Sequence, residues 1–371
     1  MKYQEKMNQK DNNQEEIEQT QATEALEDNE LYEHHHIIVD KGQTLLRIDK
    51  YLQMHLEGIS RTKIQAAAEA QCILVNGKAS KSNYRVKPFD EISILLPEPP
   101  HEFEVLPENV PFKIVYEDDD VLVIDKQPGL VVHPGYGNFT GTLLNGLMYY
   151  YQDKKDKEGN TITPYLVHRI DKDTSGLLIV AKNEAAQIIL GKQFFDHTIE
   201  RKYNALVWGD FDEDMGTIDG NLIRSPKDRR IMTVVENDSD DPLHTEERGK
   251  RAITHWRVLE RFGYVTLVEC VLETGRTHQI RAHMRHIGHP LFNDETYGGD
   301  KILKGTTFSK YKQFVMNCFK KLPRQALHAL ILGFEHPTTH KHLHFESPLP
   351  EDMKNVVEKW KGYAMNSKGD L

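Results

Sequence analysis

The feature that most constrains this chain is the stretch from residue 168 to 182, which reads HRIDKDTSGLLIVAK. Its second half, residues 177–181, is a short apolar run with β-branched residues, which is typical of a buried strand. Its first half places His168, Arg169 and Asp171 next to the turn-forming residues 173–176. Because a turn ahead of a buried strand holds side chains rigidly at a surface, this stretch predicts a scaffold that presents polar groups for chemistry.

Composition alone favours a purely structural turn at this place, since short polar side chains bond to the local backbone. The order of the residues is more specific. HRIDKDTSG followed by LLIVAK resembles the active-site motif of the RluA-type pseudouridine synthases, with Ile170 where the family usually has Leu. The resemblance implies that Asp171 is the catalytic residue. For His168, structural packing is the better interpretation.

Other parts of the chain resemble further motifs of the same family, in the family's order. These are HPG with GN and GTLLN within residues 133–145, RKYNALVWG at 201–209, and LETGRTHQIRAHMRHIGHPLFND at 272–294. The match covers residues 41–360.

By this resemblance Tyr203 is the active-site tyrosine, and Arg281 is the arginine that pairs with the catalytic carboxylate. Arg276 is the other arginine of the same motif. Arg169 and Arg276 are expected to bind the substrate.

The reaction that the resemblance implies is the isomerisation of uridine within RNA. The bond from ribose C1′ to uracil N1 is cut, and C1′ is rejoined to uracil C5. No redox step or group donor is needed, so we expect no cofactor and no metal. A carboxylate can act as a nucleophile or stabilise positive character at the sugar, and the sequence leaves both roles open.

Two side chains are expected to assist Asp171. Arg281 beside it should hold the pKa of the carboxyl below its usual value, against the effect of burial. Tyr203 should stack on the uracil, and its hydroxyl should take part in removing the C5 proton. A base inside a helix cannot reach such a pocket, so the target uridine must be flipped out or lie in a loop.

A small globular unit precedes these motifs. Between residues 44 and 97, LLRIDKYLQMHL and ISRTKIQAAAEAQ have helical spacing with Ser60 as an N-cap, ILVNGKAS predicts a hairpin, and DEISILLP alternates like a strand. This pattern resembles the S4 RNA-binding domain. The segment carries a net charge of +3. Arg61 and Lys63, at a helix start, are expected to contact RNA phosphates.

The fold class we predict is α+β. A catalytic domain with a mixed, largely antiparallel sheet of the pseudouridine synthase type (112–371) follows a small S4-like α/β RNA-binding domain (41–97) and a proline-containing linker (98–111). Residues 1–40 are predicted to be a disordered acidic tail. Residues 1–33 carry a net −7 of the chain's −10, which leaves −3 for the rest.

An S4 domain combined with this catalytic type resembles the ribosomal C and D subgroups of the family. The expected substrate is therefore large-subunit (23S) ribosomal RNA. Two alternatives are a transfer RNA pseudouridine synthase and a non-catalytic RNA-binding protein of ribosome assembly. Because the chain has no apolar run of about 18 residues and no secretory signal, we expect a cytoplasmic protein with no membrane partner. We also expect it to act as a monomer.

Several other patterns are weaker. Histidines 278, 283, 286 and 289 invite a zinc hypothesis, but their spacing is not a known ligand pattern. A hydrolase built on Ser175, His168 and Asp171 lacks the GxSxG motif. Three successive aspartates, residues 118–120, favour turn solvation over a cation site. The widely spaced cysteines Cys72, Cys270 and Cys318 are expected to be buried free thiols.

Overall fold

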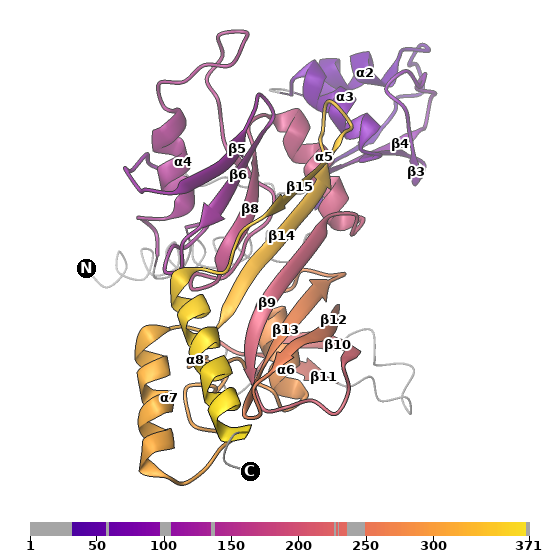
Figure 1. Cartoon of the computed structure of the whole chain (residues 1–371). Helices are drawn as coiled ribbons and strands as arrows, with labels where there is room; N and C mark the ends of the chain where they lie inside the picture. The colour runs from indigo at the N-terminus through magenta and orange to yellow at the C-terminus, as the bar shows by residue number, and fades with distance from the viewer. Residues whose placement is uncertain are drawn as a thin grey trace, which may run out of the picture.

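The computed structural model describes residues 32–56, 59–96, 105–134, 138–225, 228, 230–235 and 249–368. Within these ranges the chain forms an N-terminal unit (32–96) and a large unit (105–368), each built around its own sheet (Figure 1). The predictions for residues 1–31 and for the linker segment 97–104 lie outside the described residues. No helix among the described residues has both the length and the apolar character that crossing a membrane requires.

The N-terminal unit packs two helices on a four-stranded sheet of order β1-β4-β2-β3. Its elements are β1 (Tyr32–Ile38), α2 (Ile48–His55), α3 (Arg61–Glu69), β2 (Ile73–Val75), β3 (Lys78–Ala79) and β4 (Glu91–Leu96). The N-cap prediction is confirmed, because Ser60 Oγ accepts the backbone N–H of Lys63 at 3.1 Å. The hairpin is confirmed too, with Asn76 and Gly77 at positive φ between β2 and β3.

The assignment of residues 1–40 to a disordered tail is wrong for β1, which pairs antiparallel with β4. Ile37 packs against the core of the N-terminal unit, and Val39 just beyond the strand is fully buried in it. Burying these side chains and pairing one edge of β4 outweighs the polar composition around them. The polar histidines before Ile37 interrupt the apolar pattern by which a strand is recognised in a sequence.

The large unit is built on an eleven-stranded sheet. Nine strands follow the order β11-β10-β12-β13-β9-β14-β8-β6-β5, while β15 pairs with β14 and β7 pairs with β8. The strands are β5 (Lys113–Glu117), β6 (Val121–Lys126), β7 (Tyr165–Leu166), β8 (Ser175–Ala181), β9 (Glu200–Trp208), β10 (Met215–Arg224), β11 (Met232–Val235), β12 (Lys250–Arg261), β13 (Val265–Leu272), β14 (Leu327–Glu335) and β15 (His342–Glu346). Only the β8–β14 pairing is parallel among those described, so the predicted mixed, largely antiparallel sheet is confirmed.

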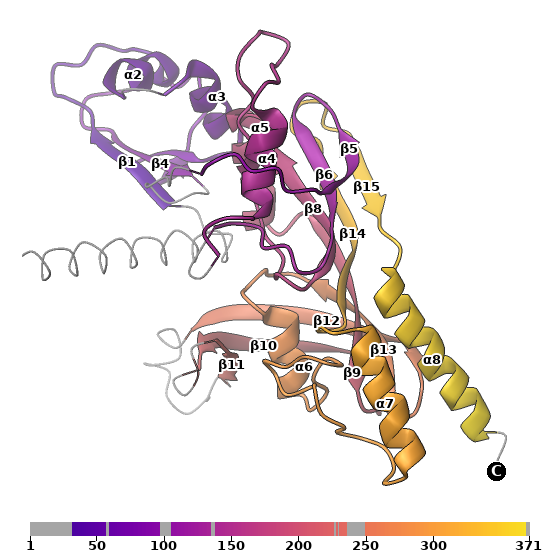
Figure 2. The same ribbon diagram turned by 90° about the vertical axis from the view of Figure 1, so that its left-hand side faces the viewer.

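Five helices cover this sheet: α4 (Leu143–Tyr151), α5 (Glu184–Phe195), α6 (Gln279–His286), α7 (Ser309–Lys321) and α8 (Glu351–Lys368). Alternation along β9 separates two cores. Ala205 and Val207 face the core that includes α4 and α6, whereas Leu206 and Trp208 face α7 and α8. Figure 2 shows α4 and α6 on one side of the sheet and α7 and α8 on the other. The face shared by α4 and α6 is where the candidate site lies.

The predicted turn at residues 173–176 ends earlier than expected, because β8 already begins at Ser175. Gly176 pairs with Ala329 of β14 in the parallel contact. Its φ is +111°, and a Cβ there would lie 2.1 Å from the Ala329 carbonyl oxygen. The glycine of this motif therefore serves a close approach between two strands rather than a turn.

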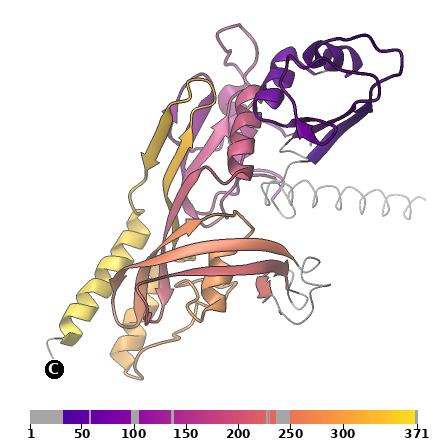
Figure 3. The same ribbon diagram turned by 90° about the vertical axis from the view of Figure 1, so that its right-hand side faces the viewer.

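Helix α5 is buried on two faces. Ala186, Leu190 and Phe194 pack on the sheet, while Ile188 belongs to the core of the N-terminal unit. At the rim, Glu184 lies 3.5 Å from Lys63 Nζ. Figure 3 shows the N-terminal unit, in indigo, seated beside this helix. Helix α5 thus joins the two units through a shared apolar contact.

Candidate active site

Asp171 lies in the turn that leads into β8, and this turn is fixed through its backbone. The Thr174 N–H donates to the Asp171 carbonyl at 3.1 Å. The Lys172 carbonyl accepts from Lys126 Nζ at 2.8 Å and from the Gly129 N–H at 2.9 Å. A turn held from three directions keeps the Asp171 side chain in one position, as catalysis requires.

Two buried cations hold this turn. Lys126 is fully buried, and its ammonium also donates to the carbonyls of Gln127 and Leu130, so each of its three N–H groups has an acceptor. Arg324 donates to the Asp173 carbonyl at 3.0 Å and pairs with Asp352 at the start of α8. Elements far apart in sequence thereby converge on the backbone of the Asp171 turn.

The carboxylate of Asp171 is paired with Arg281 of α6. Nη1 of Arg281 donates to Oδ2 of Asp171 at 3.0 Å, while its Nε and Nη2 donate to Asp294 at 2.7 and 2.9 Å. The Asp294 side chain is 1% exposed, and that of Asp171 is 20% exposed. Asp294 therefore aims the guanidinium in a two-pronged contact, and the third donor is left for the more accessible carboxylate.

The charges around Asp171 favour its ionised form. Burial would raise the pKa of the carboxyl, but His278, Arg281 and Arg169 outweigh that effect and hold the pKa below its usual value. Burial also lowers the pKa of His278 to about 4, so its ring is neutral at pH 7. At neutral pH the two arginines therefore supply the stabilising charge, and His278 adds to it only in acid.

His278 has a defined orientation beside Asp171. The Met232 N–H donates to the Tyr297 hydroxyl oxygen, which leaves the hydroxyl proton for His278 Nδ1, 3.1 Å away. The proton of the neutral ring is then on Nε2, which lies 3.9 Å from Asp171 Oδ2. Strand β11 thus contributes to the surroundings of the site.

A cleft that is partly open to solvent surrounds the Asp171 carboxylate. Tyr203 of β9 lines it, together with the apolar side chains of Ile170, Leu272 and Leu327. Burial raises the pKa of the Tyr203 phenol, so its hydroxyl is protonated at neutral pH. The cleft offers an apolar wall with an aromatic ring, facing a carboxylate and several arginines.

The structure brings five of the sequence-predicted residues together. Asp171, Tyr203, Arg281, Arg169 and Arg276 all line this one cleft. Their grouping agrees with their predicted roles, which themselves remain predictions.

The two predicted contacts of the N-terminal unit lie elsewhere. Arg61 is 52% exposed and lies 3.6 Å from Asp49. The Lys63 side chain is 18% exposed and is directed at Glu184 of α5. His168 has the packing role expected of it, because its Nε2 accepts the Ile179 N–H and its ring stacks on Phe194.

Sequence reasoning missed several residues around the site. Asp294 ends the motif that contains Arg281 and could have been found there, since a buried arginine needs a carboxylate. Lys126, Arg324 and Tyr297 gave no such signal, because each acts through backbone or side-chain groups far along the chain.

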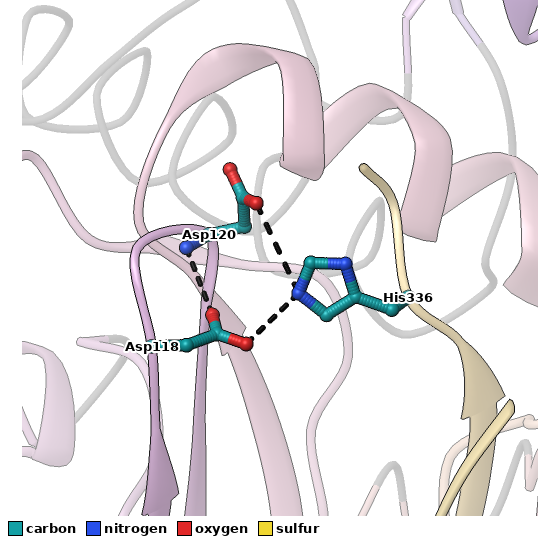
Figure 4. A group of neighbouring side chains, drawn as sticks. All are labelled: Asp118, Asp120 and His336. Carbon is teal, nitrogen blue, oxygen red and sulfur yellow. Dashed lines mark hydrogen bonds and ion pairs between the residues drawn. The ribbon is translucent and has the colours of Figure 1, made fainter. Parts of the chain in front are cut away.

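The acidic run at residues 118–120 forms a hydrogen-bonded turn. Asp118 Oδ1 accepts the backbone N–H groups of Asp120 and Val121, and its Oδ2 lies 2.9 Å from His336 Nε2 (Figure 4). His336 Nδ1 accepts the N–H groups of Thr338 and Thr339, which places the ring proton on Nε2. A nitrogen that donates has no lone pair for a metal, so this arrangement suits a structural turn.

The four histidines of the zinc hypothesis do not converge. No metal-type cluster in the described ranges includes any of residues 278, 283, 286 and 289. His283 contacts Thr254, and His289 contacts the Trp208 carbonyl. The three cysteines are free and buried, as predicted.

Comparison with known families gives two matches. Residues 120–286 match the model of the RNA pseudouridylate synthase family, and residues 46–92 match the S4 domain. The first match contains Asp171, Tyr203 and Arg281 together with Arg169 and Arg276, and the second covers most of the N-terminal unit.

Curated relatives are similar over most of their length. An uncharacterized RNA pseudouridine synthase of Chlorobaculum parvum is 47% identical over 86% of this chain and 96% of its own. A second uncharacterized RNA pseudouridine synthase, from Bacillus subtilis, is 45% identical over 87% and 96%. The ribosomal large subunit pseudouridine synthase D of Nitrosomonas europaea is 40% identical over 84% of each chain.

A solved structure shares the fold. The structure of human RNA pseudouridylate synthase domain containing 4 aligns with a TM-score of 0.51 and 23% identity, over 67% of this chain and 93% of the human one. At this level of identity, the likeness shows a shared fold.

Proposed function

Because the chain belongs to the RluA-type family of RNA pseudouridine synthases, we propose that Asp171 is its catalytic residue and that its substrate is large-subunit ribosomal RNA. The observation that carries the first part is the ionised Asp171 carboxylate, held by Arg281 at 3.0 Å in a cleft with an aromatic wall. The second part is supported by relatives whose names specify the ribosomal large subunit.

In the proposed reaction, the target uridine is flipped into the cleft with ribose C1′ next to Asp171. The carboxylate either attacks the sugar or stabilises the positive character that develops there when the bond to uracil N1 breaks. The detached base turns, and its C5 bonds to C1′. Arg281 keeps the carboxylate ionised for this step, and the fixed turn keeps it in place.

Tyr203 is proposed to stack on the uracil, since its ring lines the apolar side of the cleft. Its hydroxyl is protonated in the resting site. It can therefore accept the C5 proton only after it has given its own proton to another group. Arg169 and Arg276 are half-exposed on the cleft and are proposed to contact the RNA backbone near the flipped nucleotide.

The N-terminal unit is an S4 domain, and we assign it the binding of RNA outside the cleft. Arg61 is half-exposed and free to reach a phosphate after leaving Asp49. Lys63 could take part only if its contact with Glu184 opened. We place the catalytic domain at residues 112–371 and begin the RNA-binding unit at β1.

The decisive experiment is a pseudouridine map of total RNA from cells that lack this protein, rescued with the wild type or with Asp171→Asn. We expect ribosomal sites that disappear on deletion and return only with the wild type. If the sites that disappear lie in transfer RNA, the substrate is transfer RNA and the assignment to ribosomal RNA is wrong. Sites restored by Asp171→Asn would refute the catalytic role of Asp171.

A further inference from the structure

Arg201 lines the same cleft from β9, two residues before Tyr203. Residues two apart on a strand share a face of the sheet, so the two side chains point into the cleft together. Arg201 is only 5% exposed. The half-exposed Arg169 and Arg276 lie at more open parts of the wall. Arg201 is therefore placed deep in the cleft, near the ring proposed to hold the base.

The charge of Arg201 has no counter-charge within the part of the chain that the structure describes. Three arginines are buried in the described part of the chain; Arg281 pairs with two carboxylates and Arg324 pairs with Asp352. Arg201 has neither a hydrogen bond nor an ion pair to any described residue, and its Nε is sealed from solvent without a partner. Its guanidinium lies 5.3 Å from the centre of the Phe194 ring.

The histidine next to Arg201 does not offset this charge. Burial lowers the pKa of His168 to about 3, so the ring is neutral. A buried cation without a counter-charge is costly for folding, and such groups are found where a site uses them. The position of Arg201 therefore indicates a ligand that becomes negatively charged inside the cleft.

The reaction generates such a charge on the base. When the bond from C1′ to N1 breaks, its electron pair stays on N1, and the negative charge spreads over the uracil oxygens O2 and O4. The base returns this pair by bonding through C5, which then loses its proton while N1 gains one. No further reactant is needed.

We propose that Arg201 is a catalytic residue that donates hydrogen bonds to a uracil carbonyl oxygen and stabilises the detached uracil anion. This inference rests on the proposed placement of the uridine between Asp171 and Tyr203. A donor positioned before the reaction, in a cleft of low polarity, interacts more strongly with the developing charge than with the neutral base. It therefore accelerates bond cleavage more than it strengthens RNA binding.

The test uses the full chain with a transcript carrying a uridine that the wild type modifies. Single-turnover rates at saturating enzyme are compared for Arg201→Met, Arg201→Lys and the control Lys202→Met. Lys202 is the next residue on β9, and it pairs with Glu200 at 3.0 Å. We expect a rate loss of about 100-fold for Arg201→Met, a smaller loss for Arg201→Lys, and little change in the control.

RNA affinity and thermal unfolding complete the test. Arg201→Met should bind the transcript within a few-fold of wild type and should melt at the same or a higher temperature, because an unpaired buried charge is removed. A normal saturated rate with weakened affinity would assign the guanidinium to a phosphate and overturn the proposal. A lowered melting temperature with a normal rate would assign it a structural role, which also overturns it.

Asp171→Asn in the same assay separates this inference from the proposed function. If Asp171→Asn is inactive while Arg201→Met keeps the wild-type rate, only the role of Arg201 is wrong. If Asp171→Asn converts the uridine, the placement of the substrate is wrong, and the proposal for Arg201 falls with it.

Discussion

At the scale of single residues, the charge state of Asp171 depends on Arg281. Wild-type activity should be lost in acid only below the ordinary pKa of a carboxyl, because the pKa of Asp171 is lowered. Replacing Arg281 by Gln removes one compensating charge and its hydrogen bond, so that burial raises this pKa against the weaker effect of His278 and Arg169 alone. We expect the acid limb of the single-turnover rate to move up by about 1 to 3 pH units.

Asp294→Asn is the control, since it leaves the contact of Arg281 with Asp171 in place. It should destabilise the protein without moving the acid limb far. If Arg281→Gln has the pH profile of the wild type, Arg281 does not set the ionisation of Asp171.

The role of the Tyr203 hydroxyl can be tested with a single substitution. Tyr203→Phe keeps the aromatic wall of the cleft but removes the phenol, whose pKa is raised by burial. If the hydroxyl relays the C5 proton, the single-turnover rate should fall by about 100-fold or more while RNA affinity is unchanged. A rate equal to wild type would restrict this residue to stacking.

At the scale of elements, the parallel contact of β8 with β14 places the Asp171 turn. Gly176→Ala would put a methyl 2.1 Å from the Ala329 carbonyl oxygen at a φ of +111°. We expect a loss of about 3 kcal/mol or more in the free energy of unfolding, measured by denaturant titration, together with loss of activity.

Gly263→Ala separates backbone strain from the clash. Gly263 has a φ of +84°, but a Cβ there would meet nothing within 4 Å. Its substitution should cost about 1 kcal/mol and leave activity intact. If both substitutions lower the free energy of unfolding equally, the close approach of β14 is not the reason that residue 176 must be glycine.

Some helices and strands could be predicted from the sequence, and others could not. The periodicity around α2, α3 and α8 indicates these helices directly, because one side of each is apolar. The apolar run of β14 indicates a strand, and both of its faces are buried. Helix α6 was not expected, since it carries the charged motif of Arg281 with the arginine turned inward. Tertiary pairing with Asp294 and Asp171 makes that burial tolerable.

At the scale of the whole molecule, helix α5 couples the two units through Ile188. Ile188→Ala should cost about 2 to 5 kcal/mol and divide unfolding into two transitions, because the contact between the units weakens. The protein is unfolded in denaturant, and the unfolding of the N-terminal unit is monitored by its sensitivity to proteolysis. Leu190→Ala on the sheet side of α5 is the control and should shift a single transition. The same behaviour in both variants would argue against coupling through α5.

The family and the fold class could be predicted from the sequence alone, because local motifs specify turns, strands and polar side chains together. The motifs also single out Asp171, Tyr203 and Arg281 as candidates for the site. Their assembly in one cleft could not be predicted, since β8, β9 and α6 meet only through the sheet.

Tertiary structure alone decided which charges have partners. Asp294 compensates Arg281, whereas Arg201, which looks like an ordinary strand residue in the sequence, is buried with no counter-charge among the described residues. Strand β1 and the double-faced helix α5 were decided in the same way, because burial depends on which surfaces meet. Local sequence patterns specify what a side chain can do, and long-range packing sets the surroundings in which it acts.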